Sequence, residues 1–483
     1  MSQRDPITEL REAVTRMLNR LDQDAPISAT VVFQVDGAKE GDFARNLEAL
    51  SNATRRLSGA NVFAYGERQP TDPPAHGGSG PVEYVIYEDW ETVEQFRKQW
   101  DSEHLQKFQA GVGGFLVAPP DLRFYRGWSD AGTRAEVPRT GQTRCYGTGG
   151  EIIDCADTGQ DGDIRAGAAW PEPRFRDNRD GTVTDRLTRL TWLKDADRFG
   201  EVTWDEALAN AKSLAGGSHG LTDNSKAGDW RLPNIKELFS LIDYGAGDPI
   251  IPHDNPFTNV RSSIYWTSTT LVAAPTLAWM MTLGIGPTVF DLKINPNRMW
   301  PVRGKNSRVP KTGQRVCFNT RGDMIECAGT GQDGDVRAGA AWPAPRFTDN
   351  RDGTVTDNLT GLVWLRKANP FGLRTWQQAL DDCNGLRSGQ HGLKDGSRAG
   401  DWRLPNIREI ESLVDYNEAG PCLPRAEELP FEDLRPSSYW TSTSVALAPT
   451  EAMFIILGVG PAIFENKEHP FFVWPVRDRR RAR

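Results

Sequence analysis

Aspartates form two matching sets that could bind a metal ion. The first set is Asp161, Asp163, Asp177, Asp180 and Asp185, and the second is Asp333, Asp335, Asp349, Asp352 and Asp357. Carboxylate oxygens are the ligands that calcium prefers, so each set is a candidate calcium site. The spacing is not that of an EF-hand, because the bidentate glutamate at the end of the loop is missing. Asp-Gly pairs also make tight turns, and we favour structural turns over calcium.

Cysteines recur at matching positions as well, as the pairs Cys145–Cys155 and Cys317–Cys327. Each pair flanks a glycine-containing turn, and this spacing suits a disulfide that closes a hairpin in an oxidising compartment. The N-terminus lacks the apolar segment of a signal peptide, so reduced thiols remain the alternative. We expect Cys383 to be a buried free thiol on a helix, and we place Cys422 in a turn.

Signature motifs of catalysis do not occur in the sequence. There is no Walker loop, no GxSxG and no HExxH. Six histidines and no CxxC motif disfavour zinc. The arginines of the repeated motif GDWRLPN, Arg231 and Arg403, could clamp an anion. The motif precedes a predicted helix in both places, so we favour a structural corner.

The aspartates and cysteines belong to a tandem repeat. The segment TGQDGDIRAGAAWPEPRFRDNRDGTVTD at 158–185 returns at 330–357 with three substitutions. Twelve of the sixteen tryptophans form six matched pairs. The repeat predicts two modules, 139–304 and 311–478, which are joined by the polar linker 305–310 and followed by the basic tail 479–483.

Each module has the same predicted order of elements. The stretch 182–193 alternates like a β-hairpin. A helix follows whose first turn has the capping box Thr203-x-x-Glu206, and a second helix is capped by Asn234-x-x-Glu237. Short strands with a Gly-Pro turn close the module. The pattern predicts a compact α+β fold with the paired tryptophans in its core.

At these motifs the chain resembles the C-terminal domain of the Legionella collagen-like adhesin, a family largely of unknown function. The motifs TGQDGD, DNRDGTVTD, GDWRLPN, YWTSTS and WPVR carry the resemblance, which covers both modules almost entirely. It implies a C-type-lectin-like fold, and binding or adhesion as the function. No basic cluster lies within either module, which disfavours heparin-like ligands.

The late segments 271–300 and 445–474 differ most between the modules. In lectin-like folds this region forms the usual ligand face, so its divergence indicates two different binding surfaces. We align Trp279 with Phe454. The predicted ligand-binding residues are Trp279, Asp291 and Asn297 in the first module, and Phe454, Glu465 and Phe471 in the second.

The N-terminal part has a different pattern. An amphipathic helix is predicted in 1–27, with Leu10, Val14, Leu18 and Leu21 on one side. In 28–127 the predicted order is β-α-β-β-α-β, which is ferredoxin-like. The loop QPTDPPAHGGSGP separates the second and third strands.

The stretch WETVEQFRKQWDSEHLQKFQ resembles the antibiotic-biosynthesis monooxygenase family, over about 100 residues. The resemblance implies a dimer that shares a β-barrel. In family members that work without a cofactor or handle haem, an aromatic residue and a histidine line the cavity. Trp90 and His104 match these positions and are the candidate catalytic residues. The alternative, which we favour, is a structural role for both residues, with Trp90 in the core and His104 on a helix surface.

Composition limits the function further. A net charge of −8 and a pI near 5.5 disfavour nucleic-acid binding, and no stretch is long and apolar enough to span a membrane. We expect a cytoplasmic protein, or an extracytoplasmic one that leaves by a leaderless route if the cysteine pairs are oxidised. The favoured function is a non-catalytic binding or scaffold protein, a homodimer or part of a larger assembly, with a protein or glycan partner. The alternative is an oxygenase whose modules serve targeting, which a haem or flavin band would indicate.

Overall fold

The computed structural model describes residues 11, 14–19, 27–54, 60–67, 82–90, 93–118, 120–126, 135, 137–304, 308–343, 345–424 and 429–479. Leu10, Leu21, the predicted loop at 69–81 and the tail residues 480–483 lie outside these ranges. The chain divides into two compact units, 1–133 and 134–483, and each is described by itself.

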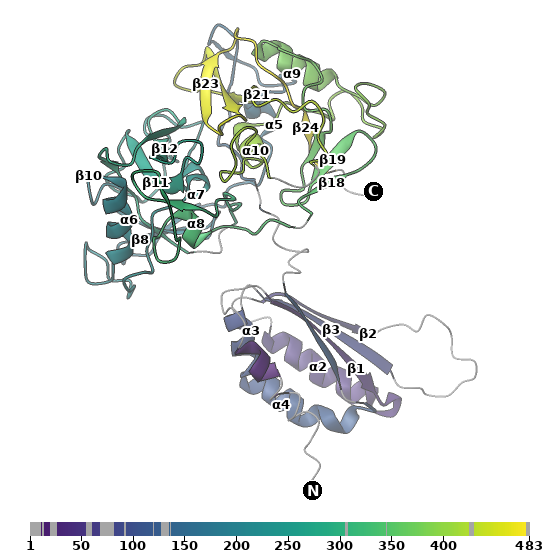
Figure 1. The fold of residues 1–483 in the computed structure, drawn as a ribbon. Helices are drawn as coiled ribbons and strands as arrows, with labels where there is room; N and C mark the ends of the chain where they lie inside the picture. Colours follow the sequence, from purple (N-terminus) through teal and green to yellow (C-terminus); the bar gives the residue numbers. More distant parts are fainter. Residues whose placement is uncertain are drawn as a thin grey trace. The chain divides into compact units, whose positions relative to one another are not determined.

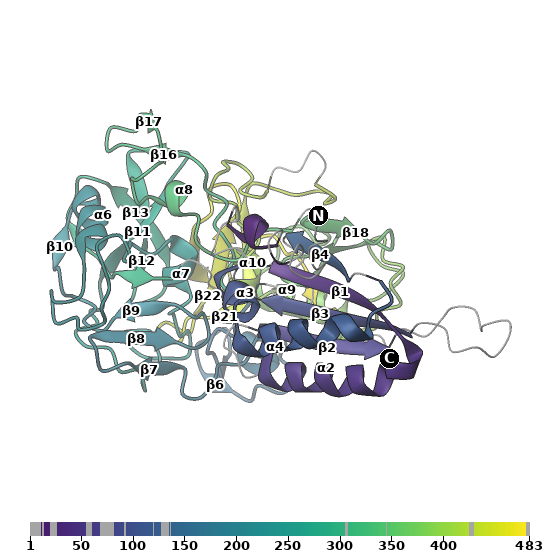
Figure 2. The same ribbon diagram turned by 90° about the horizontal axis from the view of Figure 1, so that it is seen from below.

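The first unit is one antiparallel sheet with helices on one face. Its elements are β1 (Ile27–Val35), α2 (Glu40–Thr54), β2 (Ala60–Glu67), β3 (Val82–Trp90), α3 (Val93–Trp100), α4 (Glu103–Val112) and β4 (Asp121–Arg126). The strand order is β2-β3-β1-β4, and every pairing is antiparallel. This is the predicted ferredoxin-like arrangement. Helices α2 and α4 lie side by side against the sheet (Figures 1 and 2).

The core of the first unit lies between this sheet and its helices. Alternate residues of β1, such as Ala29 and Phe33, point toward the helices and are buried, which is the period expected of a sheet covered on one face. Val14 and Leu18 belong to the same core. The predicted packing of the N-terminal segment is therefore confirmed for these two positions.

The first repeat copy contains the predicted hairpin and both capped helices. Strands β8 (Thr182–Asp185) and β9 (Thr191–Leu193) pair antiparallel. Helix α6 (Trp204–Ser213) begins with the predicted capping box, in which Glu206 accepts from the backbone N–H of Thr203. The predicted second helix, α7 (Ile235–Phe239), is only five residues long.

Strands of the first copy that follow residue 170 form two sheets. One has the order β10-β14-β11-β12-β13, from β10 (Glu201–Val202), β14 (Asn297–Arg298), β11 (Ile264–Thr270), β12 (Leu277–Thr282) and β13 (Thr288–Leu292). The other has the order β15-β9-β8-β7, with β15 (Val302–Arg303) and β7 (Phe175–Asp177). Strand β13 is thus an edge strand.

The second copy repeats this plan. Its hairpin sheet has the order β18-β19-β20-β24, from β18 (Phe347–Asp349), β19 (Thr354–Asp357), β20 (Val363–Leu365) and β24 (Val476–Arg477). Its helices are α9 (Trp376–Gly385) and α10 (Ile407–Glu411). The three-stranded sheet β21-β22-β23 comprises β21 (Ser438–Ser444), β22 (Glu451–Ile456) and β23 (Ala462–Asn466).

The matched tryptophans are mainly core residues, as predicted. Five of the six pairs are fully buried: 192/364, 204/376, 230/402, 266/440 and 300/474. Trp170 and Trp342 are half-buried instead, and each lies under an arginine, Arg174 or Arg346. A single buried cluster contains residues of both copies, from Trp192 to Trp474. The copies therefore share this cluster, whereas the pairs 204/376 and 266/440 lie in smaller clusters that belong to one copy each.

The arginines of GDWRLPN are corner residues. Arg231 is buried and donates to both carboxylate oxygens of Glu237, at 2.6 Å each. Arg403 and Glu409 repeat the contact at 2.6 and 2.7 Å. A guanidinium that is paired with both oxygens of a buried carboxylate has a structural role. This is the interpretation that we favoured from the sequence.

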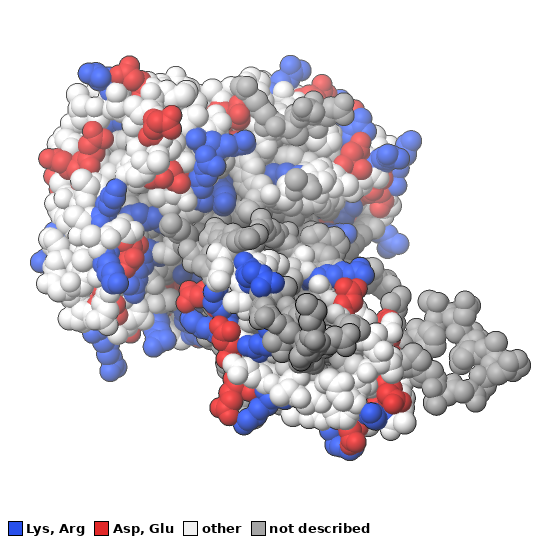
Figure 3. All heavy atoms as spheres, turned by 60° about the horizontal axis from the view of Figure 1, so that its bottom comes forward, with Lys and Arg blue, Asp and Glu red and all other residues white. Residues whose placement is uncertain are grey.

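Charged side chains of both signs are interspersed on the face shown in Figure 3. Within the described part of the chain, no helix is long and apolar enough to cross a membrane.

Candidate functional site

The beginning of each repeat copy packs on the other copy. Residues 138–168 form the first exchanged segment, a loop closed at its base by a bridge between Pro138 and Ala168. Residues 310–340 form the second exchanged segment, closed in the same way by Pro310 and Ala340. Their short helices lie in the opposite copies: α5 (Asp161–Ile164) contacts β21, and α8 (Asp333–Val336) contacts β11 (Figure 1).

One buried aspartate fastens each exchanged segment. Asp161 accepts hydrogen bonds from Thr140 of its own segment and from Thr443 of the second copy, both at 2.7 Å. Asp333 accepts the equivalent bonds from Thr312 and Thr269. Burial raises the pKa of Asp161 and that of Asp333 to about 6.

A glutamine in each segment extends the contact. Gln142 donates to the carbonyl of Ser444 at 2.7 Å and accepts from its N–H at 3.0 Å, as a neighbouring strand would. Gln314 makes the same two bonds to Thr270. These bonds fix the register of segment and sheet, because each side chain pairs with one backbone position.

Each exchanged segment carries one disulfide, and both predicted cysteine pairs are bonded. Cys145–Cys155 joins the ends of the hairpin of β5 (Cys145–Tyr146) and β6 (Ile152–Ile153). Cys317–Cys327 does so for β16 (Cys317–Phe318) and β17 (Met324–Ile325). Cys383 and Cys422 are free and buried. Of the two redox alternatives, the structure has the oxidised one.

A buried lysine holds each hairpin from the opposite copy. Lys293 donates to the carbonyl of Phe318 at 3.2 Å and lies 4.1 Å from the centre of the Trp204 ring. Lys467 takes the same position toward Tyr146 and Trp376. Burial lowers the pKa of Lys293 to about 7 and that of Lys467 to about 8.

The predicted aspartate sets do not come together as metal sites. Among the described residues, no group of three or more potential metal ligands is found. The aspartates serve turns and ion pairs instead: Asp163 accepts from Gly159 N–H, Asp180 caps Thr182, Asp177 pairs with Lys194 and Asp185 with Arg174. In the second copy the corresponding partners are Gly331 for Asp335, Thr354 for Asp352, Arg366 for Asp349 and Arg346 for Asp357.

Two of the predicted ligand-binding residues are buried. Trp279 is 1% exposed and packs edge-on against Tyr416 of the second copy at 5.4 Å, so it belongs to the contact between copies. Phe454 is 4% exposed. The alignment of these two residues was wrong as well, since Trp279 pairs with Phe290 across β12–β13 while Met453 pairs with Phe464 across β22–β23. Neither ring offers a free surface to a ligand.

The remaining predicted residues are partly exposed and differ between the copies. In the first copy, Asp291 accepts a hydrogen bond from Asn297 at 3.1 Å. In the second copy, Phe471 packs on Phe454, with ring centres 4.3 Å apart. Glu465 bonds to the backbone N–H of Asn466. The late segments thus present a polar cluster in one copy and an aromatic one in the other.

Sequence reasoning missed a set of exposed apolar side chains, which we call the apolar edge. It consists of Phe290, Leu292, Ile294, Met324 and Ile325, which are 43, 42, 64, 67 and 36% exposed. The first three come from the first copy and the last two from the second exchanged segment, whose hairpin is held by the bond of Lys293 to Phe318, the strand partner of Met324. The signal was the alternation Phe290-x-Leu292-x-Ile294, which reads Phe464-x-Asn466-x-Glu468 in the second copy.

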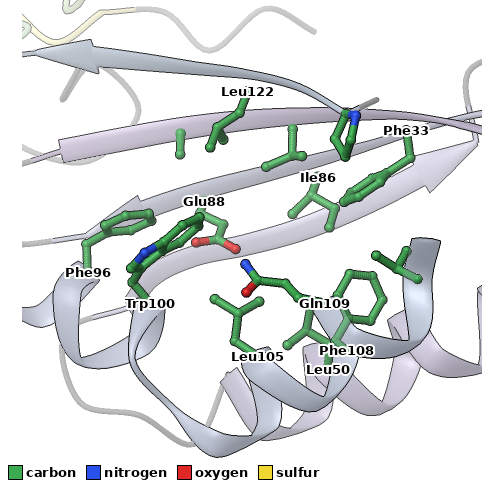
Figure 4. A pocket seen from close by; sticks show the side chains of 14 residues that line it. Phe33, Leu50, Ile86, Glu88, Phe96, Trp100, Leu105, Phe108, Gln109 and Leu122 are labelled. Atoms are coloured by element: carbon green, nitrogen blue, oxygen red, sulfur yellow. The ribbon is translucent and has the colours of Figure 1, made fainter. Parts of the chain in front are cut away.

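The first unit contains a pocket between its sheet and helices α3 and α4 (Figure 4). The cavity volume is about 50 Å³, and the pocket is open on one side. The walls are mainly apolar and include the rings of Phe33, Phe96, Trp100 and Phe108. The carboxyl group of Glu88, on β3, points into this space (Figure 4).

Glu88 is buried in these surroundings, and burial raises its pKa to about 7. Trp90 donates its indole N–H to Glu88 at 3.1 Å and is itself fully buried. His104 lies outside the pocket lining and bonds to Gln99 at 2.8 Å. The predicted pair Trp90 and His104 therefore does not share a cavity, and the carboxyl group that does face it was not foreseen.

Comparison with known proteins agrees with the repeat. The model of the Lcl C-terminal domain family matches residues 181–303 and 353–477, together about half of the chain. The chain belongs to this family. We call residues 134–483, which contain both matched domains, the Lcl pair. Both matches begin after an exchanged segment, so the disulfide hairpins lie outside the matched domains. No curated protein matches the chain.

Solved structures resemble the first unit. The protein Rv0793 from Mycobacterium tuberculosis is 20% identical and covers 22% of this chain and 99% of its own, with a TM-score of 0.19. Putative antibiotic biosynthesis monooxygenases from Caulobacter crescentus CB15 and Nitrosomonas europaea are 15 and 18% identical, each with a TM-score of 0.19. They cover 22 and 23% of this chain, and 92 and 96% of theirs.

Proposed function

We propose that this protein is a non-catalytic binding protein whose Lcl pair binds a protein partner through the apolar edge. The observation that carries the proposal is the exposure of five large apolar side chains, three on or just after β13 and two on the hairpin of the second exchanged segment. A large exposed apolar surface is rare on soluble proteins unless it is covered in a complex. The family membership supports a binding role, since the resemblance implies adhesion or ligand binding.

The partner that fits this surface supplies an extended apolar segment. Strand β13 is the edge of its sheet, and its first residue, Thr288, bonds to Ala462 of β23. In this proposal an added strand pairs with the later residues of β13. Phe290 and Leu292 point to the same side of β13, and an added strand would place alternate apolar side chains against them. Backbone pairing would supply affinity, and the alternating side chains specificity.

The second copy serves a different purpose in this proposal. The positions of Leu292 and Ile294 are taken by Asn466 and Glu468, which are exposed and polar. Binding of an apolar strand there would bury a carboxylate without a partner, which is unfavourable. The Lcl pair therefore offers one protein-binding edge, and a glycan ligand of the second copy and the lectin-like fold stay predictions of the resemblance.

In this proposal the first unit forms a dimer, so each assembly has two apolar edges. The face of its sheet that the helices leave uncovered includes Thr30, Val32 and Val85, which are half-buried in the single chain. Pairing two such faces would give a dimer with four Lcl domains. Two linked binding edges raise the apparent affinity for a repetitive partner without any new contact.

Exchange of residues between the copies tests the proposal. The double variant Leu292→Asn, Ile294→Glu gives the first copy the residues of the second. Partner capture by the immobilised full-length chain should fall at least roughly tenfold, because apolar contacts at the centre of an interface dominate affinity. Thermal unfolding should stay nearly unchanged, since both positions are exposed.

The reciprocal variant Asn466→Leu, Glu468→Ile is the matched control. It alters the same positions of the other copy and should leave capture by the first copy intact. If wild type and the first double variant capture the same proteins equally well, the apolar edge is not the binding surface.

A second candidate function, small-molecule chemistry in the first unit, is favoured by the Glu88 pocket alone. An oxygenase that uses haem or flavin would give the purified protein an absorption band in the visible range. A colourless protein would leave the pocket as a binding site or as a site for chemistry without a coloured cofactor.

A further inference from the structure

The pocket of the first unit contains one acidic group and no base. Of the residues that line it, Glu88 is the sole titratable one. Among the described residues, no lysine, arginine or histidine forms an ion pair with Glu88, and its polar contact is the indole N–H of Trp90. Burying a carboxyl group without a cation lowers the stability of the fold, so we expect the group to have a function.

We propose that this pocket binds a small organic cation, whose ammonium group pairs with Glu88 and whose apolar part lies against the aromatic wall. The site is independent of the apolar edge, because it lies in the other unit of the chain. It adds a ligand class to the protein that the Lcl pair does not account for.

The walls suit a cation with an apolar body. The rings of Phe96 and Trp100 stack with centres 6.1 Å apart on one side of the pocket, and Phe108 lies on another. Aromatic faces attract cations, and ammonium ligands are commonly held by such rings. The aliphatic residues Ile86, Leu105 and Leu122 complete an apolar lining for the remainder of the ligand.

A cation of the chain itself already contacts two residues of the pocket lining. The guanidinium of Arg11 lies over the Trp100 ring at 5.6 Å, and Arg11 also donates to the side chain of Gln109. Arg11 does not pair with Glu88, so it leaves the carboxyl group open to a ligand. This contact shows that the aromatic wall accepts a positive charge.

Two polar groups of the pocket lining would orient the ligand. The indole N–H of Trp100 is buried and, within the described part of the chain, has no hydrogen-bond partner. The amide of Gln109, on α4, points toward Glu88 across the pocket (Figure 4). A hydroxyl or ether oxygen on the ligand would give the Trp100 donor a partner.

Binding of such a cation depends on the charge of Glu88, so the affinity should change with pH. Burial holds the pKa of Glu88 near 7, so the carboxyl group is mostly neutral at pH 6 and mostly ionised at pH 8. An ammonium ligand prefers the ionised form. Its affinity should therefore rise roughly tenfold from pH 6 to pH 8.

The test is calorimetric titration of the full chain with benzylamine and with benzyl alcohol at both pH values. Benzylamine stays charged over this range, so the pH dependence reports on the protein. We expect benzylamine to bind more tightly at pH 8, and benzyl alcohol to bind weakly without this increase. Equal binding of both compounds, or no binding of benzylamine at pH 8, would overturn the proposal.

Two variants assign the effect to Glu88. Glu88→Gln keeps the shape and removes the charge, so benzylamine affinity should fall at least roughly tenfold at pH 8 and lose its dependence on pH. His104, which bonds to Gln99 and Ser102 on the same side of the unit, would retain its titration in this variant. A pH dependence that survives in Glu88→Gln therefore belongs to another group and refutes the assignment.

Trp90→Phe is the second variant, and it does not depend on how Glu88→Gln folds. The Trp90 hydrogen bond lowers the pKa of Glu88, so its loss should raise that pKa and move the rise in benzylamine affinity to higher pH. If Trp90 only supports the fold, Trp90→Phe should change the benzylamine affinity by the same factor at all pH values. An unshifted profile would contradict the role given to Glu88.

Discussion

Asp161 of the first repeat copy accepts a hydrogen bond from Thr443 of the second copy at 2.7 Å, although 282 positions separate them in the chain. Asp333 and Thr269 make the symmetric contact at the same distance. The two Lcl domains are therefore one folding unit in which each copy receives a segment from the other. Such a reciprocal contact has the form of an isologous interface within a single chain.

The buried aspartates should make stability depend on pH. The pKa of Asp161 is about 6 in the folded protein and near 3.8 without burial, so the folded state binds the extra proton between these values. Stability from this group is highest below about pH 4 and decreases as pH rises through 6. Asp161→Asn removes this titration, so urea unfolding should show wild type losing up to about 3 kcal/mol relative to the variant over that range. A constant difference would contradict the buried position of Asp161.

Fragments should reveal which segment completes which copy. Residues 169–340 contain the first copy with the exchanged segment that covers it, whereas residues 139–304 contain the segment that covers the other copy. We expect 169–340 to be the better folded monomer by circular dichroism and light scattering. The fragment 139–304 should be unfolded or self-associated, because its β11 lacks the Asp333 contact. A folded, monomeric 139–304 would show that the exchange is dispensable.

Thiol counting tests the redox state. Denatured protein that has not been reduced should react at Cys383 and Cys422 alone, since the other four cysteines are bonded. Removing one disulfide should cost about 2–4 kcal/mol of stability, by releasing a short loop in the unfolded chain. Six reactive thiols would mean that the hairpins are held without disulfides in the protein as isolated.

Truncation of Trp279 should affect stability more than binding. Its ring is 1% exposed and packs on Tyr416, so Trp279→Ala would leave a cavity where the copies meet. Denaturant titration should find a loss of about 3–5 kcal/mol. Met453→Ala, at the equivalent position of the second copy, is the control for an ordinary core truncation. An unchanged midpoint for Trp279→Ala would restore the interpretation of this ring as a ligand contact.

Dimerisation should be a property of the first unit. Residues 1–127 hold their own core, and light scattering on this fragment should report two chains. Placing a charge on the uncovered face with Val32→Lys should give a monomer with unchanged circular dichroism, because a half-buried position tolerates the lysine only when the face is free. A monomeric wild-type fragment would contradict the proposed dimer.

The sequence by itself determined the features that depend on neighbouring residues. The capping boxes at Thr203 and Asn234, the 182–193 hairpin and the Cys145–Cys155 pair all join residues within about ten positions of each other. Duplication strengthened these predictions, because each pattern occurred twice in the same order. The tryptophan pairs were predicted as core for the same reason, and five of the six pairs are fully buried.

The tertiary structure alone decided which residues meet across long distances. Thr443 as the partner of Asp161 follows from the exchange between copies, and a repeat in the sequence is equally compatible with two separate modules. Glu88 became a candidate only when α3 and α4 closed an apolar pocket over its strand, since a glutamate in an alternating strand otherwise suggests an exposed position. Burial and pairing of this kind arise from the packing of distant elements, which has no short period in the chain for sequence analysis to detect.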